Sequence, residues 1–406
     1  MATQPPLIDF EMLRQKASTV FTPAVPIAKE SLFAGRIDQV RKLADAINQR
    51  GQHAVLFGER GVGKTSLANV IGERWQGTGY ILAPRIGCLS TDDWVELWNK
   101  GLREIVLTTK DPRAGFRGGH VETAVDAAAG LPENFSMNDV RASLTSIGRS
   151  AVLVIIFDEF DTLNPEARKS LAEAVKLFSD YSVPVTLILV GVADSVGDLL
   201  RDHQSIERAL VQVQMPRMSD EELEQIVNNG LPELGMSITA SAMRKIIRLS
   251  RGLPHYTHLL GLYAARGALA REGLRVAETD VDGAIGEALD NAQQSTKDAY
   301  ASAIASSQTA HLYRQVLLAC ALAETNEFGF FSASAVSAPL SVIMGKRYEV
   351  PSYARHLTEF CSDKRQHILE RIGDKRSYRY RFRNPLMQPF VVLKGYSAGI
   401  IHAEVD

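Results

Sequence analysis

A glycine-rich octapeptide that directly follows a short apolar run is the feature that most constrains the fold of this chain. Residues 58–65 read GERGVGKT and match the pattern G-x-x-x-x-G-K-[ST] in full. The four residues before them, AVLF at 54–57, predict a buried strand. A strand, a glycine-rich loop and a helix in this order predict an α/β domain built on a parallel sheet.

The residue types of this loop predict its chemistry. Three glycines let backbone N–H groups approach phosphate oxygens, because side chains at these positions would block the approach. Lys64 is expected to contact the β and γ phosphates of ATP, and Thr65, with Ser66 as a second hydroxyl, is expected to bind Mg²⁺. A chance glycine turn before a helix is the alternative, but it leaves eight matching positions unexplained. The predicted loop residues are Gly58, Glu59, Arg60, Gly61, Val62, Gly63, Lys64, Thr65 and Ser66.

Length and composition exclude several classes of protein. A chain of 406 residues predicts about two or three domains. A net charge of −2 predicts no overall affinity for polyanions, so any contact with nucleic acid requires a local basic patch. The three cysteines are far apart, which predicts buried thiols in a reducing compartment. No apolar run reaches the ~18 residues of a membrane span. We therefore expect a cytoplasmic protein without a membrane contact.

Apolar runs that alternate with helical patterns extend the α/β prediction. Strands are expected at 80–88, 151–157, 185–192 and 210–215, which predicts a three-layer parallel α/β domain. Residues 108–135 have no clear period and predict an insertion loop. Residues 1–28 carry four prolines around a short amphipathic segment and predict an arm rather than a domain.

The second half of the chain predicts two further modules. Ser219 and Glu222 form a capping-box signature that opens a helical stretch to about residue 295. Beyond residue 308, three helical patterns precede two β-like runs, which predicts a winged helix-turn-helix. The expected organisation is an arm at 1–28, a P-loop core at 29–217, a helical lid at 218–297 and a winged helix at 298–406.

An acidic pair follows the strongest predicted strand. Asp158 and Glu159 come directly after AVLVIIF at 151–157. A carboxylate beside a P-loop can hold Mg²⁺, and a neighbouring glutamate can polarise a water that attacks the γ-phosphate. A strand end that merely faces solvent is the alternative. Together with the P-loop, the pair predicts ATP hydrolysis.

Two further positions are candidates for catalysis. Asp194, with Ser195, ends the next predicted strand, where it is expected to contact the γ-phosphate or the attacking water; a helix N-cap is the alternative. Arg208 precedes the last core strand, where an arginine can reach a neighbouring subunit's site in a nucleotide-dependent homo-oligomer. A surface role is the alternative for Arg208 and the favoured interpretation for Arg201.

The succession LFAGR, GERGVGKTS, IIFDEFD, VGVADS, SIER and RGLPHY resembles the AAA+ superfamily over about residues 30–295. The initiator-like ATPases of origin recognition and the STAND signalling ATPases are the most similar branches. The resemblance implies that Gly35 and Arg36 lie near the adenine end of the nucleotide. The alternative is a turn glycine beside a surface arginine.

The same resemblance places Pro254 and His255 in the sensor region of the lid. Initiators usually carry an arginine there, whereas this chain has the glycine-x-proline and following polar residue of STAND proteins, with Arg251 nearby. His255 is then expected to contact a phosphate in one nucleotide state; a helix start marked by glycine and proline is the alternative. The departure favours a nucleotide-controlled switch over a stable ring motor.

The carboxyl-terminal region is locally basic. Residues 346–383 contain eleven Lys or Arg and five Asp or Glu, an excess of six positive charges. Alternation along a strand puts Arg379, Arg381 and Arg383 on one face, which predicts contacts with DNA phosphates. Lys375 and Arg376, between the two β-like runs, are expected to contact phosphates as well, and Arg355 on the preceding helix is a candidate for reading bases. One alternative is a strand that is merely solvated. The other is a surface that docks on the ATPase domain of the same chain.

Two hypotheses therefore stand. The first is an ATPase switch that couples nucleotide state to binding of DNA or of an unidentified protein partner through the winged helix. The second is a STAND-type signalling or defence switch that holds nucleotide tightly and does not bind DNA.

Overall fold

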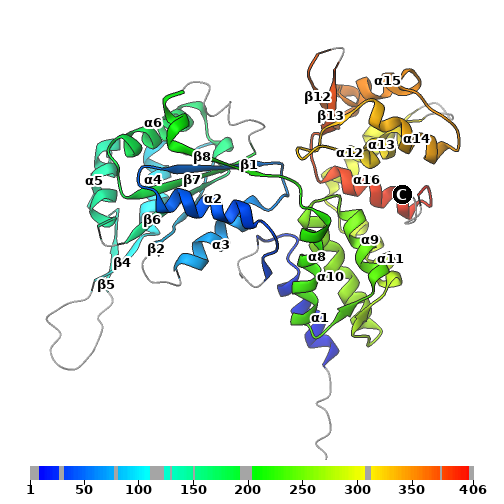
Figure 1. Cartoon of the computed structure of the whole chain (residues 1–406), viewed down its shortest axis with the longest axis horizontal. Helices are drawn as coiled ribbons and strands as arrows, with labels where there is room; N and C mark the ends of the chain where they lie inside the picture. The colour runs from blue at the N-terminus through cyan, green and yellow to red at the C-terminus, as the bar shows by residue number, and fades with distance from the viewer. Residues whose placement is uncertain are drawn as a thin grey trace, which may run out of the picture. The chain divides into compact units, whose positions relative to one another are not determined.

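The computed structural model describes residues 9–26, 32–76, 81–109, 123–128, 130–149, 151–192, 204–306, 312–374 and 377–401. The chain divides into two compact units, which are described separately (Figure 1). The sheet unit comprises residues 26–58 and 64–215. The helical unit comprises residues 1–25, 59–63 and 216–406. The four-part division expected from the sequence stays a prediction.

A parallel sheet forms the centre of the sheet unit. Its strand order is β2-β6-β7-β1-β8, and β3 also pairs with β6. All the runs expected as strands of the α/β domain lie in this sheet, and those at 54–57, 151–157 and 185–192 form its central strands, so the α/β prediction is confirmed. A break at Ala83 and Pro84 divides the predicted strand at 80–88 in two. The strands are β1 (His53–Gly58), β2 (Ile81–Leu82), β3 (Arg85–Gly87), β6 (Val152–Asp158), β7 (Val185–Gly191) and β8 (Leu210–Met215).

Helices cover both faces of this sheet (Figure 1). They are α2 (Ile37–Asn48), α3 (Lys64–Gln76), α4 (Trp94–Arg103), α5 (Met137–Ile147) and α6 (Pro165–Asp180). Asp93 caps α4 by accepting from the Glu96 N–H at 2.8 Å. Trp98 is fully buried, with its ring 5.4 Å from that of Phe157 and 5.7 Å from that of Phe178. This tryptophan is a core residue.

The stretch expected to be an insertion loop contains a β-ladder. Strand β4 (Val106–Thr109) pairs antiparallel with β5 (Thr123–Asp126). The prediction of a loop was therefore wrong for residues 108–109 and 123–126. Each strand has only four residues, which is too short for an alternating pattern to stand out, although valine and threonine favour strands.

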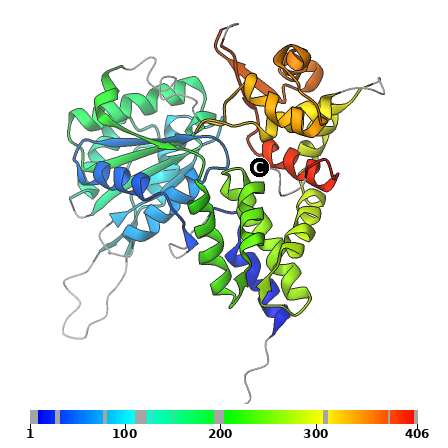
Figure 2. The ribbon, with the colours of Figure 1, turned by 45° about the vertical axis from the view of Figure 1, so that its right-hand side comes forward.

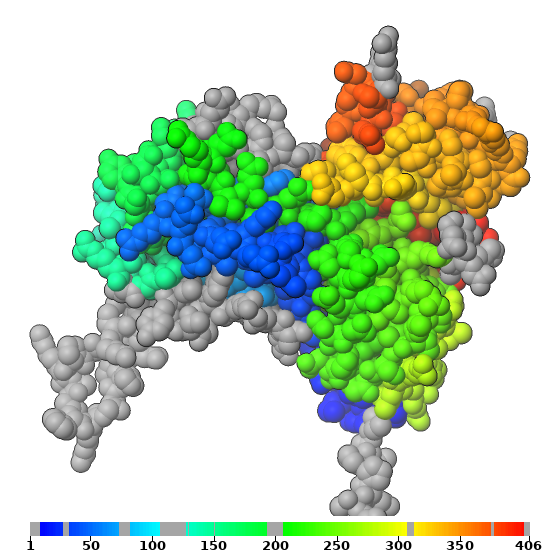
Figure 3. Space-filling model, in the orientation of Figure 1, coloured from blue at the N-terminus to red at the C-terminus, as the bar shows by residue number. Residues whose placement is uncertain are grey.

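The first part of the helical unit packs four helices and the amino-terminal arm. The helices are α8 (Asp220–Glu233), α9 (Ala240–Ser250), α10 (Pro254–Ala270) and α11 (Glu278–Asp290). The capping box at Ser219 and Glu222 is present. The arm forms α1 (Phe10–Val20), which packs on α10, visible in blue against green in Figure 3. Phe21 then fills a slot between Gly230 and Gly261, where an added Cβ would lie 2.7 or 2.9 Å from its ring. The arm is thus an integral part of this unit.

The carboxyl-terminal module, residues 294–401, completes the helical unit. Its strands β12 and β13 lie side by side (Figure 2), and β11 pairs with the other edge of β13. The two β-like runs expected from the sequence are therefore strands, and β11 was missed because it has two residues. The elements are α12 (Gln294–Ile304), α13 (Tyr313–Leu322), β11 (Phe331–Ser332), α14 (Ser337–Met344), α15 (Val350–Phe360), β12 (Leu369–Ile372), β13 (Arg379–Phe382) and α16 (Met387–Ser397).

Among the described helices, none combines the length and apolar character that a membrane crossing requires.

Candidate nucleotide-binding site

The P-loop runs from the end of β1 to the start of α3. Gly61 and Gly63 have φ angles of 87° and 94°, which only glycine adopts without strain. Lys64 is the first residue of α3, and its Nζ donates to the Gly58 carbonyl at 3.0 Å. The lysine is 8% exposed, so its charge is held inside the loop rather than in solvent. Of the other loop residues, Arg60 is exposed and Val62 is buried.

Asp158 and Glu159 have different environments at the end of β6. Asp158 is buried, and its Oδ1 accepts from Thr65 Oγ1 at 3.3 Å and from the Glu159 N–H at 3.0 Å. Glu159 adopts a left-handed conformation with φ of 56° and is exposed. The hydroxyl of Thr65 and the carboxylate of Asp158 are the hard oxygen donors that Mg²⁺ prefers, so these residues fit this cation.

Arg85, which the sequence analysis did not single out, contacts Asp158 from the neighbouring strand. Its Nη2 and Nε lie 2.9 and 3.1 Å from Asp158 Oδ2. The strand register explains the contact, because Arg85 pairs with Ile156 and Gly87 with Asp158. Paired residues of neighbouring strands share a face of the sheet, and so do residues two apart on one strand, so Arg85, Ile156 and Asp158 share a face. The sequence signal for this contact was the position of Arg85 within the strand predicted at 80–88.

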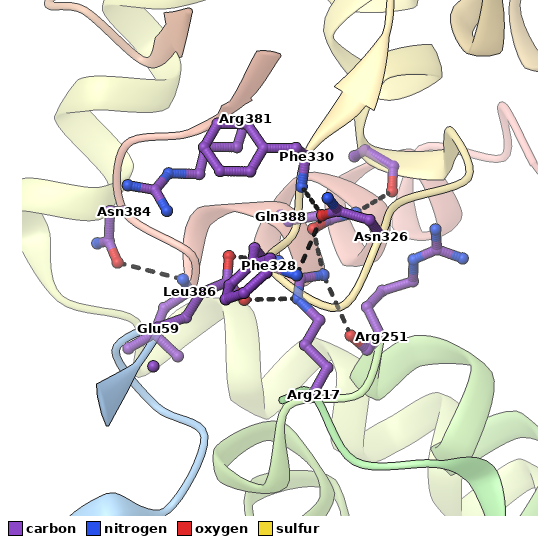
Figure 4. Close-up of polar contacts among 12 residues, drawn as sticks. Glu59, Arg217, Arg251, Asn326, Phe328, Phe330, Arg381, Asn384, Leu386 and Gln388 are labelled. Carbon is purple, nitrogen blue, oxygen red and sulfur yellow. Dashed lines mark hydrogen bonds and ion pairs between the residues drawn. The ribbon is translucent and has the colours of Figure 1, made fainter. Parts of the chain in front are cut away.

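Glu59 of the P-loop is bound within the helical unit by Arg217 (Figure 4). Arg217 donates through Nε to Glu59 Oε2 at 2.7 Å and through Nη2 to Oε1 at 3.3 Å. The two side chains are 10% and 3% exposed, so water contributes little to solvating either charge. Arg217 also donates through Nη1 to Gln388 Oε1 at 2.6 Å. The loop is thereby joined to the second residue of α16.

The backbone comes close to side chains at Gly329, beside this ion pair, and at Gly61 of the same loop as Glu59. A Cβ on Gly329 would lie 2.1 Å from Glu59 Oε1 and 2.6 Å from Arg217 Nη2. A Cβ on Gly61 would lie 2.9 Å from Leu386 Cδ2. We call Glu59, Arg217, Gly329, Leu386 and Gln388 the Arg217 cluster. Figure 4 labels Glu59, Arg217, Leu386 and Gln388.

Neighbouring residues hold the cluster in place. Gln388 donates through Nε2 to the Ala321 carbonyl at 2.9 Å, and Tyr256 donates its hydroxyl to the Leu386 carbonyl at 2.8 Å. Arg251 directs its guanidinium to the carbonyls of Leu322 and Ala323, at 3.3 and 3.1 Å. The guanidinium of Arg251 is therefore engaged at the end of α13.

The residues placed at the adenine end and in the sensor region lie at the starts of helices. Gly35 and Arg36 both have left-handed backbones, and Arg36 is buried at the start of α2. Pro254 begins α10 and lies near the P-loop, 3.9 Å from where a Cβ on Gly63 would stand. His255 Nδ1 lies 2.7 Å from the Pro23 carbonyl, which can only accept. Burial lowers the pKa of His255, which favours a neutral ring with the proton on Nδ1.

Several other predicted site residues lie on exposed positions or outside the described part of the chain. Asp194, Ser195, Arg201, Lys375 and Arg376 belong to the second group. Arg208 is exposed in the short 3-10 helix Gln204–Ala209, and its carbonyl accepts from Gln52 Nε2 at 3.3 Å.

The predicted basic face of the β13 strand is only partly exposed to solvent. Arg379 and Arg383 are exposed. Arg381, in contrast, is 12% exposed, forms an ion pair with Glu370 and lies over the Phe330 ring at 4.5 Å. Alternation within one strand does not predict this pairing, because Glu370 lies on the partner strand opposite Arg381. Arg355 is 86% exposed and pairs with Glu359 at 2.7 Å.

Comparisons with known proteins agree with this geometry. Residues 32–189 match the AAA ATPase domain family. A Walker-type ATPase of Pyrococcus abyssi is similar in structure, with 17% identity, coverage of 92% of this chain and 99% of that one, and a TM-score of 0.54. The ORC2 protein of Aeropyrum pernix, solved as ADPNP–ADP complexes, has 13% identity, coverage of 94% and 98%, and a TM-score of 0.51. Among curated proteins, none matches significantly. The match covers less than half of the chain, and the solved structures show that the chain has their P-loop fold.

Proposed function

We propose that this protein is an ATP-binding and ATP-hydrolysing switch whose nucleotide state is coupled to the carboxyl-terminal module. The Arg217 cluster is the observation that carries this proposal. It connects Glu59, inside the phosphate-binding loop, to Gln388, at the start of α16, through one guanidinium whose side chain is 10% exposed. A ligand that changes the conformation of the loop therefore changes the stability of contacts made by the module, and the coupling is reciprocal.

The proposed reaction is attack of water on the γ-phosphate of ATP. Lys64 stabilises the phosphates, Thr65 and Asp158 hold Mg²⁺, and Glu159 accepts a proton from the attacking water. When bound, Mg²⁺ would neutralise charge on the β and γ phosphates. The exposed carboxylate of Glu159 and the buried carboxylate of Asp158 suit these two roles, because one must meet water and the other must keep a fixed orientation.

The lid residues extend the proposal to the sensing of nucleotide. Pro254 lies next to Gly63, so His255, the following residue, is near enough to the loop to respond to a phosphate. In the described state its ring is engaged by Pro23 of the arm. We assign His255 as the sensor that exchanges this carbonyl for a phosphate, and Gly35 and Arg36 to the adenine end.

The proposed output is binding of duplex DNA through a winged helix formed by α13–α15 and the β11-β13-β12 sheet. Its support is the local excess of positive charge and the exposure of Arg379, Arg383 and Arg355. A STAND-type signalling or defence switch without DNA binding is the second candidate. The sequence RGLPH at 251–255 and the internal engagement of Arg381 favour it.

A salt titration of DNA binding separates the two candidates. Replacing Arg379 and Arg383 together by alanine is expected to weaken binding to unrelated duplexes by similar factors. Each lost phosphate contact should lower the slope of log affinity against log salt by about 0.9. The control is Arg41→Ala, which removes an exposed arginine of the sheet unit. If the wild-type protein binds no duplex at low salt with either ATP or ADP, DNA is not the output and the second candidate is favoured.

A mixing experiment tests whether Arg208 acts in a neighbouring subunit. Turnover per subunit should then rise with protein concentration, because only an oligomer has completed sites. Mixing Arg208→Ala with Lys64→Ala should restore part of the activity, since the second variant offers its Arg208 to the intact P-loop of the first. A monomeric species whose turnover is independent of concentration would remove Arg208 from the site.

A further inference from the structure

Arg85 and Asp158 form an ion pair at the proposed metal site. We infer that Arg85 is the positioning residue of Asp158, and that it fixes the orientation in which this carboxylate binds Mg²⁺ together with ATP. The inference rests on the proposed ATPase function and adds a residue that acts through Asp158 rather than on the substrate.

The two oxygens of Asp158 have separate partners. Oδ1 accepts from Thr65 Oγ1 and the Glu159 N–H, whereas Oδ2 accepts from the Nε and Nη2 of Arg85. Rotation of the carboxylate would break contacts on both sides at once. The side chain of Asp158 is 4% exposed, so water cannot replace the lost donors. Arg85 therefore binds Oδ2, and Oδ1 stays beside the Thr65 hydroxyl.

Arg85 is itself anchored to the helix that carries Lys64. Its Nη1 donates to Asn69 Oδ1 on α3 at 2.8 Å, and its backbone N–H donates to Glu104 Oε2 at 3.1 Å. One guanidinium thus joins α3, which begins at Lys64, to the carboxyl end of β6. Residues behind a metal ligand commonly fix its geometry in this way.

The charge of Arg85 opposes Mg²⁺ binding, whereas its positioning of Asp158 favours it. A cation beside a carboxylate lowers the attraction of that carboxylate for Mg²⁺. The guanidinium, however, lies on Oδ2, away from the hydroxyl of Thr65, and the Arg85 side chain is 39% exposed, so solvent screens its charge. The two donors of the rigid guanidinium, in contrast, hold Oδ2 from two fixed directions, which a single ammonium group does not do. We therefore expect the positioning effect to exceed the repulsion.

The measurement is the factor by which Mg²⁺ strengthens ATP binding. All proteins carry Glu159→Gln so that ATP is not consumed, and calorimetry gives the ATP affinity with Mg²⁺ and with a chelator. Arg85→Met is expected to lower this factor about tenfold, as for other residues behind a metal ligand. Arg85→Lys, which keeps the charge but loses the fork, should also lower it. Asn69→Ala should have a smaller effect in the same direction, and Arg41→Met should have none.

Each outcome shows whether or not Arg85 positions Asp158 for Mg²⁺ binding. An unchanged factor in Arg85→Met, or a larger one, would overturn the inference, and so would a wild-type factor in Arg85→Lys beside a lowered one in Arg85→Met. Affinity in chelator reports whether the variant is folded; if Arg85→Met is not, Arg85→Lys decides the question. Absence of ATP binding by the parent protein would instead contradict the proposed function.

Discussion

Glu159→Gln is expected to bind ATP with wild-type affinity and to hydrolyse it at least about 100-fold more slowly. The amide has the size of the carboxylate but cannot accept a proton from water. Glu159 is exposed and left-handed at the end of β6, so the substitution leaves the buried contacts of Asp158 in place. Phosphate release measures turnover and calorimetry measures binding. Wild-type turnover in this variant would show that another residue activates the water.

The matched variant is Lys64→Ala, which should lose binding instead of chemistry. The loss of a charge-assisted contact of about 1.5–3 kcal/mol corresponds to about 10- to 100-fold in affinity. The side chain is held inside the loop by the Gly58 carbonyl, so its charge has a fixed place. Unchanged ATP affinity in Lys64→Ala would contradict the assignment of the P-loop as the nucleotide site.

Gly329→Ala is expected to speed nucleotide release about 10- to 100-fold. A methyl group there would overlap Glu59 Oε1 and Arg217 Nη2, so these side chains must shift, and we expect the shift to weaken the ion pair without removal of either charge. Weaker charged hydrogen bonds should destabilise, by about 1.5–3 kcal/mol, the state in which the carboxyl-terminal module contacts the P-loop. Stopped-flow dilution of a fluorescent ADP measures the release rate.

The control for Gly329→Ala is Gly345→Ala. Gly345 has a similar φ, 65° against 74°, but a Cβ there meets nothing within 4 Å. Both variants therefore carry the strain of a left-handed alanine, and only one disturbs the Arg217 cluster. Equal release rates in the two variants would show that the cluster does not restrain the nucleotide. Arg217→Met, which removes the cation itself, should release nucleotide at least as fast as Gly329→Ala.

Local patterns in the sequence were sufficient to predict much of the sheet unit. The run AVLF before GERGVGKT, and AVLVIIF before Asp158, are continuous apolar segments of the kind that buried parallel strands require. The capping box at Ser219 likewise depends on residues three apart. Such signals involve neighbours in the chain, so they can be read without knowledge of the fold.

Contacts between distant segments could not be predicted in this way. Glu59 and Arg217 are 158 residues apart, and they meet because Gly58 pairs with Met215 in the register of β1 and β8. Arg85 reaches Asp158 through the register of β3 and β6. Arg381 has its charge neutralised by Glu370 on the paired strand, which an alternating pattern in one strand cannot reveal. Register was the missing information in each case.

The central claim is that the nucleotide state of the P-loop changes the carboxyl-terminal module through the Arg217 cluster. Hydrogen exchange of the backbone amides in residues 384–397 tests it directly, with ADP and then with a non-hydrolysable ATP analogue at saturating concentration. We predict different exchange in the two states for the wild type and for Gly345→Ala, and a much smaller difference for Gly329→Ala. Identical exchange of this segment in the two nucleotide states of the wild-type protein, with both nucleotides bound, would contradict the account.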